Sequence, residues 1–85
     1  MDNRVKELIA IGASVTANCQ PCLQYHVTKA RENGAEEEDV REAIAVGKIV
    51  RKGAMGKMEE FASMMFKDNR DVPGAAEKPG GCQLT

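Results

Sequence analysis

The residues of this 85-residue sequence that are best suited to chemistry are two cysteines and a histidine close together in the chain. Cys19 and Cys22 are three residues apart, and His26, the only histidine, follows Cys22 by four. On a helix, residues at these spacings share one face, and residues three apart have Cα atoms about 5–6 Å apart. That separation allows a disulfide bond. The spacing therefore predicts a thiol pair that can be oxidised and reduced beside an imidazole.

His26 is placed to act on Cys22. Helical side chains lean toward the helix N-terminus, so the imidazole should reach back over the Cys22 sulfur. A neutral imidazole can accept the thiol proton, and the resulting imidazolium stabilises the thiolate. The first turn of a helix also favours a thiolate, because its amide protons are unpaired and the positive end of the helix dipole lies there. We therefore expect Cys22 to be an activated cysteine.

Glu7 is the candidate partner for the other nitrogen of His26. It lies at the edge of the apolar face of a helix expected over about residues 3–17, next to Ile11, so its carboxylate can turn inward. The alternative is a solvated glutamate on the helix surface, and the spacing alone leaves both interpretations open.

The cysteines lie on a second expected helix. Asn18 is suited to cap this helix, and Pro21 suits its first turn, where a missing amide proton has no helical partner to lose. The helix should end at Asn33-Gly34, because glycine readily adopts the left-handed conformation that closes a helix.

Two further helices follow in the pattern of apolar residues. The acidic run over residues 36–39 suits the start of a third helix, which either stops or bends at Arg51-Lys52-Gly53. A fourth is expected from about Ala54 to Lys67, with a methionine stripe typical of a core or a subunit interface. No segment alternates like a strand, so the sequence predicts an all-α domain over residues 1–67. The Pro/Gly-rich residues 68–85 are expected to form a flexible tail.

Composition excludes several classes of function. The formal net charge is -1 with acids and bases interspersed, so no basic stripe for nucleic acid is present. The longest uncharged stretch is too polar to span a membrane, and the N-terminal residues lack the apolar run of a secretory signal. We therefore expect a cytoplasmic protein. A chain this short, with 4% aromatic residues and no tryptophan, builds a small core, so we also expect a homo-oligomer.

Five segments of the sequence form a recognisable pattern. They are Glu7, Cys19-Gln20-Pro21-Cys22, Leu23-Gln24-Tyr25-His26, Asn33-Gly34-Ala35 and Glu42-Ala43-Ile44-Ala45-Val46-Gly47. The pattern resembles the alkylhydroperoxidase D-like branch of the carboxymuconolactone decarboxylase superfamily. The similarity runs from about Glu7 to Phe66.

The resemblance implies a bundle of about four antiparallel or orthogonal helices that is completed by assembly into trimers or hexamers. It also implies an enzyme that reduces hydroperoxides or exchanges disulfides, is regenerated by a dithiol reductant, and uses no cofactor or metal. By the family pattern, Cys22 is the thiolate that attacks the peroxide and Cys19 is the resolving thiol. His26 and Glu7 form the proton relay.

The sequence departs from the family pattern in two ways. Some members have a second histidine directly before the second cysteine, where this chain has Pro21, so a further proton donor is missing there. Many members are longer, so neighbouring subunits are expected to supply the missing cover. The decarboxylase that names the superfamily lacks the cysteine pair, and lactone decarboxylation is therefore not implied.

Two other functions fit the same residues. Cys19, Cys22 and His26 are plausible ligands of a structural zinc ion, with Cys82 as the fourth. Against zinc, such a site usually gathers ligands from separated segments, whereas these three share one helix. The second alternative is a non-catalytic helical oligomerisation module, because cysteines at helical spacing are often buried small apolar residues.

Overall fold

The protein is all-helical in the part of the chain that its structure, a computed structural model, describes, which is residues 1–66. Those residues form α1 (Asn3–Thr16), α2 (Gln20–Glu32) and α3 (Glu37–Met64), with no strand among them. The expected fold class is therefore confirmed. No described helix is both long enough and apolar enough to span a bilayer. The expected tail over residues 68–85, with Cys82, lies outside the described residues.

The chain divides into two units, Met1–Gly53 and Ala54–Thr85. The sequence left open whether the third helix stops or bends at Arg51-Lys52-Gly53, and in the structure α3 continues through this glycine. A glycine inside a helix costs only about 1 kcal/mol relative to alanine. Good helix formers flank Gly53 on both sides, namely Arg51, Lys52 and Ala54, so the glycine does not end the helix.

The turn between α1 and α2 is closed by Asn18, which has a left-handed φ of 58°. The Asn18 N–H donates to the Val15 carbonyl at 3.1 Å, and the Cys19 N–H donates to the Ser14 carbonyl at 3.0 Å. These two bonds form a Schellman motif that satisfies the end of α1. Asn18 was expected to cap α2; instead it ends α1, and Cys19 is the N-cap of α2. Asparagine tolerates the left-handed region better than other side chains do, which explains the difference.

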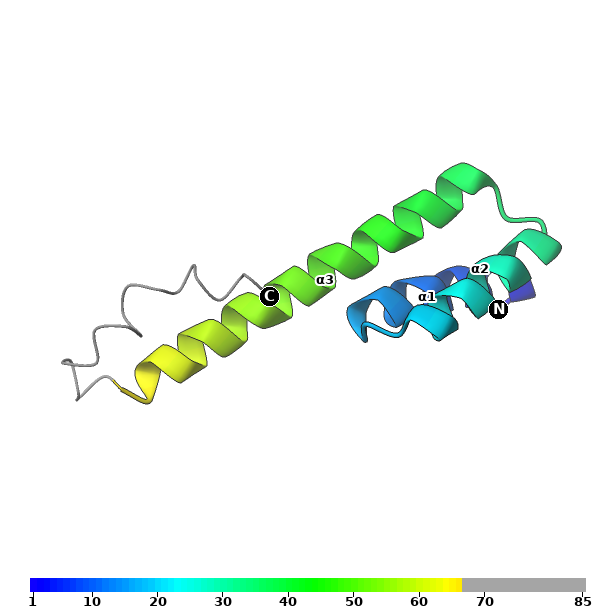
Figure 1. Cartoon of the computed structure of the whole chain (residues 1–85). Coiled ribbons are helices and arrows are strands. Elements are labelled where there is room, and N and C mark those ends of the chain that lie inside the picture. The colour runs from blue at the N-terminus through cyan, green and yellow to red at the C-terminus, as the bar shows by residue number, and fades with distance from the viewer. Residues whose placement is uncertain (67–85) are drawn as a thin grey trace. The chain divides into compact units, whose positions relative to one another are not determined.

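The helices α1 and α2 lie side by side and run in opposite directions (Figure 1). The core around them contains Ile11, Ala30 and Val40, of which Ile11 and Ala30 are fully buried. Full burial of a side chain the size of Ile11 contributes about 1.5–3 kcal/mol. This core fixes the relative position of the two helices that carry the candidate site residues.

Within the first unit, α3 approaches α1 closely through two glycines. A Cβ atom on Gly47 would lie 2.5 Å from the Gly12 carbonyl oxygen and 2.9 Å from the Val15 Cβ, so only glycine fits there. The Thr16 hydroxyl donates to the Gly47 carbonyl at 3.0 Å. The contact brings residues of α3 next to the C-terminal end of α1.

The turn between α2 and α3 agrees with the prediction that α2 ends at Asn33-Gly34. Gly34 has a φ of 87°, and the Ala35 N–H donates to the Ala30 carbonyl at 2.9 Å. Arg31 then spans the turn with two hydrogen bonds to the Glu37 carboxylate, at 2.6 Å from Nε and 3.0 Å from Nη2. The bond from Arg31 lowers the pKa of Glu37.

Candidate functional site

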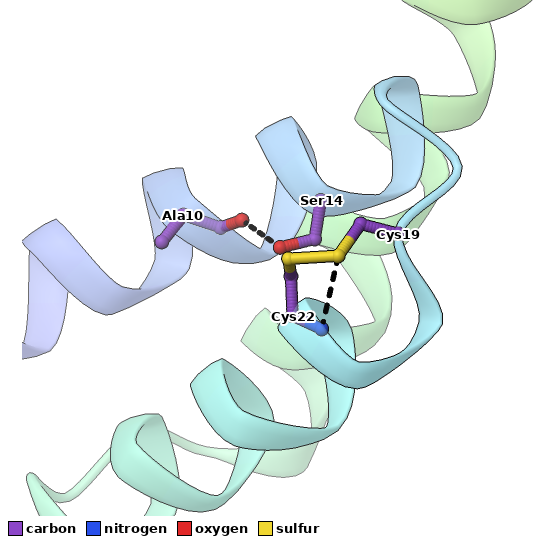
Figure 2. The surroundings of a disulfide bond; sticks show 4 residues. All are labelled: Ala10, Ser14, Cys19 and Cys22. Atoms are coloured by element: carbon purple, nitrogen blue, oxygen red, sulfur yellow. Dashed lines mark hydrogen bonds between the residues drawn. A yellow bond between two sulfur atoms is a disulfide. The ribbon is translucent and has the colours of Figure 1, made fainter.

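Cys19 and Cys22 form a disulfide at the start of α2 (Figure 2). Their Cα atoms are 5.3 Å apart, in agreement with the spacing argument. Cys19 has an extended backbone, with φ −106° and ψ 99°, as is usual for an N-cap residue, and its side chain turns toward the first turn of the helix. Pro21 lies in that turn, where it sacrifices no helical hydrogen bond.

The first turn of α2 directs an amide proton at the sulfur of Cys19. The Cys22 N–H donates to Cys19 Sγ at 3.2 Å. Together with the positive end of the helix dipole, this bond favours a thiolate at Cys19 once the disulfide is reduced. From the sequence, the helix terminus was expected to activate Cys22. The contact at Cys19 was not predicted, although an N-cap side chain normally accepts a hydrogen bond from the amide two or three residues later.

The two cysteine residues differ in their exposure. Cys22 is exposed, whereas Cys19 is half-buried. Ser14 of α1 lies in the surroundings of the disulfide, and its hydroxyl donates to the Ala10 carbonyl at 2.7 Å (Figure 2). Ser14 is buried, with 5% of its surface exposed, and was not singled out from the sequence. A small oxidant in solution therefore has freer access to Cys22 than to Cys19.

Glu7 and His26 are in contact across α1 and α2. His26 Nδ1 lies 2.6 Å from Glu7 Oε1, and the two side chains are 29% and 22% exposed. A neutral imidazole that donates its Nδ1–H to this carboxylate has its basic lone pair on Nε2. The ring of Tyr25 meets the imidazole edge-on, with the ring centroids 5.0 Å apart. Glu7 has therefore turned inward, which was one of the two interpretations left open by the sequence.

The structure brings together the four residues that the sequence analysis selected, in two pairs. One pair is the disulfide and the other is the Glu7–His26 contact. Within residues 1–66 of this oxidised form, no hydrogen bond joins His26 to either sulfur. His26 lies about one helical turn after Cys22, so any proton exchange between them belongs to the reduced state.

The zinc alternative depends partly on a residue outside the described range. Among residues 1–66, no group of three or more histidine, cysteine, aspartate or glutamate side chains has an arrangement that could hold a metal ion. Cys82, the fourth ligand considered for such a site, lies beyond residue 66.

Comparison with known proteins places the chain in a family. It is 41% identical over 54 residues to a Paracoccus denitrificans protein described as "Uncharacterized protein 4 in cox locus", covering 64% of this chain and 49% of that protein. It is 31% identical over 64 residues to an uncharacterized protein of Cupriavidus necator, covering 75% of this chain and 56% of the relative. The chain thus spans about half the length of these curated relatives.

No solved structure matches the chain. A model of the carboxymuconolactone decarboxylase family matches residues 1–55. The matched segment contains both cysteines of the disulfide, the Glu7–His26 contact and the two glycines at which α3 contacts α1. Because this segment is more than half of the 85-residue sequence, the chain belongs to the carboxymuconolactone decarboxylase family.

Proposed function

We propose that this protein is a thiol-dependent hydroperoxide reductase or thiol–disulfide oxidoreductase that cycles between the dithiol and disulfide forms of Cys19 and Cys22. The observation that carries the proposal is the disulfide at the N-terminus of α2, in which Cys22 is an exposed residue, together with the contact between Glu7 of α1 and His26 of α2. A helix terminus activates thiols, and the two cysteines are close enough to form and break a bond with little movement.

In the first step, the Cys22 thiolate attacks one oxygen of the hydroperoxide. The S–O bond forms as the O–O bond breaks, which gives a sulfenic acid on Cys22 and an alkoxide. The alkoxide takes a proton from the His26 imidazolium and leaves as the alcohol. The exposure of Cys22 supports this role, because a peroxide needs direct access to the attacking sulfur.

In the second step, the Cys19 thiolate attacks the sulfur of the Cys22 sulfenic acid. The disulfide forms, and the hydroxide takes a proton and leaves as water. The hydrogen bond from the Cys22 N–H to Cys19 Sγ supports this role, because it stabilises the thiolate that resolves the intermediate. A dithiol reductant then reduces the disulfide and is itself oxidised, which restores both thiols.

The Glu7–His26 contact supplies the proton relay in this proposal. Before the reaction, the Nε2 atom of His26 accepts the proton of the Cys22 thiol, directly or through a water molecule. Glu7 stabilises the imidazolium that forms, because its carboxylate lies 2.6 Å from Nδ1. The same imidazolium then donates its proton to the leaving alkoxide, so the histidine acts as base and afterwards as acid.

Peroxide turnover with substituted cysteines tests the proposal. With cumene hydroperoxide as oxidant and dithiothreitol as reductant, we expect Cys22→Ser to abolish turnover and Cys82→Ser to leave it unchanged. In Cys19→Ser oxidised with cumene hydroperoxide after the dithiothreitol has been removed, the sulfenic acid should persist on Cys22 and be trapped by dimedone, as detected by mass spectrometry. Unchanged turnover in Cys22→Ser would show that Cys22 is not the nucleophile.

The same samples separate the two catalytic functions from the alternatives. Disulfide exchange with no consumption of hydrogen peroxide or organic hydroperoxide would identify a thiol–disulfide oxidoreductase. One zinc ion per chain, found by elemental analysis of the purified protein, would instead support a structural zinc site. Thiols that neither titrate nor exchange would support a helical oligomerisation module.

A further inference from the structure

A pocket of about 360 Å³ lies against Cys19 in the first unit of the chain. It is bounded by the end of α1, the start of α2 and residues 44–51 of α3. Cys19 is part of its wall, whereas Cys22 is not. The volume is in the range of small-molecule sites. A ligand in this pocket would therefore lie beside Cys19 and not beside Cys22.

The lining of this Cys19 pocket combines an apolar wall with positive charge. Val15, Leu23 and Ile44 supply apolar surface, and Lys48 and Arg51 supply two cations from one face of α3. None of the nine residues that line the pocket is acidic. Within residues 1–66, neither cation has a carboxylate at ion-pair distance. The pocket therefore favours a ligand that has an apolar part and a negatively charged group.

Arg51 is held in place by the end of α1. Its Nη1 atom donates to the Val15 carbonyl at 3.2 Å and to Asn18 Oδ1 at 2.7 Å. Both bonds use the same nitrogen, so the donors on Nε and Nη2 have no partner among the described residues. A guanidinium fixed in this way can bind an anion with less loss of side-chain freedom than a mobile one.

We propose that the Cys19 pocket binds a small anionic thiol or disulfide compound and that sulfur exchange with this compound takes place at Cys19. The proposal rests on the redox function proposed above and names the class of compound that exchanges with it. Lys48 and Arg51 bind the anionic group of the ligand, and the apolar wall binds its carbon chain. The sulfur of the ligand then reaches Cys19.

The exchange balances as an ordinary disulfide reduction. The thiolate of the ligand attacks Cys19 Sγ, the Cys19–Cys22 bond breaks, and Cys22 leaves as a thiolate that then takes a proton. The product is a mixed disulfide between the ligand and Cys19. A second thiol of the ligand, or of a second ligand molecule, attacks the ligand sulfur and releases Cys19. The protein gains two electrons, and two ligand thiols become a disulfide.

A pair of charge-reversal variants tests the pocket. The full chain is oxidised and then reduced with 3-mercaptopropionate, which is anionic, or with 2-mercaptoethanol, which is neutral, and each rate is expressed per thiolate present. We expect Lys48→Glu to lower the ratio of the anionic rate to the neutral rate about fivefold, because an exposed attractive charge becomes a repulsive one. Lys52→Glu makes the same charge change on α3 outside the pocket lining and should alter the ratio by less than about twofold.

Two results would overturn the pocket as the anion site. One is an equal decrease of the ratio in Lys48→Glu and Lys52→Glu, which would indicate only the general field of the protein. The other is an unchanged ratio in both variants. Circular dichroism of each variant checks that the helices are intact, and raising the salt concentration should reduce the wild-type preference.

Single-cysteine proteins locate the exchange. Cys22→Ser with Cys82→Ser leaves Cys19 alone, and Cys19→Ser with Cys82→Ser leaves Cys22 alone. Each is reacted with 5,5′-dithiobis(2-nitrobenzoate), which is anionic, and with neutral 2,2′-dithiodipyridine. We expect the preference for the anionic reagent to be greater at Cys19, and Lys48→Glu to reduce it there only. Equal preferences at the two cysteines would contradict exchange through the pocket.

These measurements use no peroxide, so they separate this inference from the proposed function. A protein that discriminates between the reagents at Cys19 but does not consume hydroperoxide would support the pocket proposal and contradict the proposed peroxidase activity. A protein that consumes hydroperoxide without discriminating between the reagents would support the peroxidase activity and contradict the pocket proposal.

Discussion

The two cysteines have the same side chain but different surroundings. Cys19 is half-buried, caps α2 and accepts the Cys22 amide at 3.2 Å, while Cys22 is exposed. The Glu7–His26 contact lies on the next turn of α2. Differences of this kind allow the two cysteines to have separate roles, because Cys22 is exposed to solvent and Cys19 lines a pocket.

Removal of the imidazole should lower the reactivity of Cys22. In the reduced protein near neutral pH, we expect His26→Ala to slow alkylation of Cys22 by iodoacetamide about tenfold, because the base that accepts the thiol proton is lost. Mass spectrometry of the alkylated peptides measures the rate, and Cys82 in the same sample is the reference for the reagent. An unchanged rate at Cys22 would remove the histidine from the mechanism.

The helices are positioned by local signals at their ends and by one close contact between α1 and α3. The Schellman motif at Asn18 and the turn at Gly34 end α1 and α2. Gly47 lets α3 approach the Gly12 carbonyl. The wall of the Cys19 pocket depends on this approach, since Lys48 follows Gly47 directly and Arg51 lies one helical turn after Gly47 on α3.

Alanine substitutions at two glycines of α3 should have opposite effects. We expect Gly47→Ala to lower the free energy of unfolding by about 1–3 kcal/mol, because the new methyl group overlaps the Gly12 carbonyl. Gly53→Ala is the control, because a Cβ there meets no atom within 4 Å. It should raise the free energy by about 0.5–1 kcal/mol through helix propensity. Urea denaturation followed by circular dichroism measures both, and equal effects would contradict the close contact.

The Arg31–Glu37 pair should make the stability of the α2–α3 turn depend on pH. The hydrogen bond from Arg31 holds the pKa of Glu37 below its ordinary value in the folded protein. The contribution is therefore present above the unfolded-state pKa and is lost as the pH falls through the lowered folded-state pKa. We expect Glu37→Gln to lower the melting temperature slightly at neutral pH and to have no effect at strongly acidic pH.

The control for this prediction is Glu38→Gln. Both glutamates lie in the first turn of α3, so both interact with the helix dipole. Only Glu37 is bonded to Arg31. A pH dependence of the melting temperature that is the same for the two substitutions would therefore assign the effect to the dipole and not to the ion pair.

Helical spacing and the preferences of turn residues were sufficient to predict part of the fold and part of the candidate site. Helical spacing predicted that Cys19 and Cys22 can bridge, and Gly34 predicted the end of α2. The prediction that Asn18 caps α2 was wrong, because asparagine suits both a helix N-cap and a left-handed position at a helix C-terminus. The bond from Arg51 to Asn18 joins residues 33 positions apart, so periodicity along the chain holds no signal for it or for the pocket beside it.

The described chain buries little apolar surface for its size. Its buried apolar side chains are those of Ile11, Val15, Ala30 and Val40. In the first unit, a groove of about 490 Å³ is lined almost wholly by apolar atoms of α1 and α3. In the second unit, the methionine stripe is exposed, for example 64% at Met58. Surfaces of this kind are typical of subunit interfaces, and the homo-oligomer expected from the sequence stays a prediction.

Self-association is therefore the prediction at the scale of the molecule. We expect native mass spectrometry to show a trimer or hexamer, and Val46→Glu to shift it toward the monomer, because this substitution places a charge in the apolar groove. Lys48→Gln, on the same exposed stretch of α3 but outside the groove lining, is the control. A monomer in the wild-type protein at micromolar concentration would contradict the expectation.

The place of Cys19 between two helices has a practical consequence for following the protein in solution. The Cys19 N–H donates to the Ser14 carbonyl at the end of α1, and the Cys19 sulfur accepts a hydrogen bond from the Cys22 N–H. The nuclear magnetic resonance signal of that Cys22 amide should therefore move when the sulfur changes from disulfide to thiolate, because a charged acceptor strengthens the bond. Real-time heteronuclear spectra of isotope-labelled protein can then follow each turnover without a dye or an added reporter group.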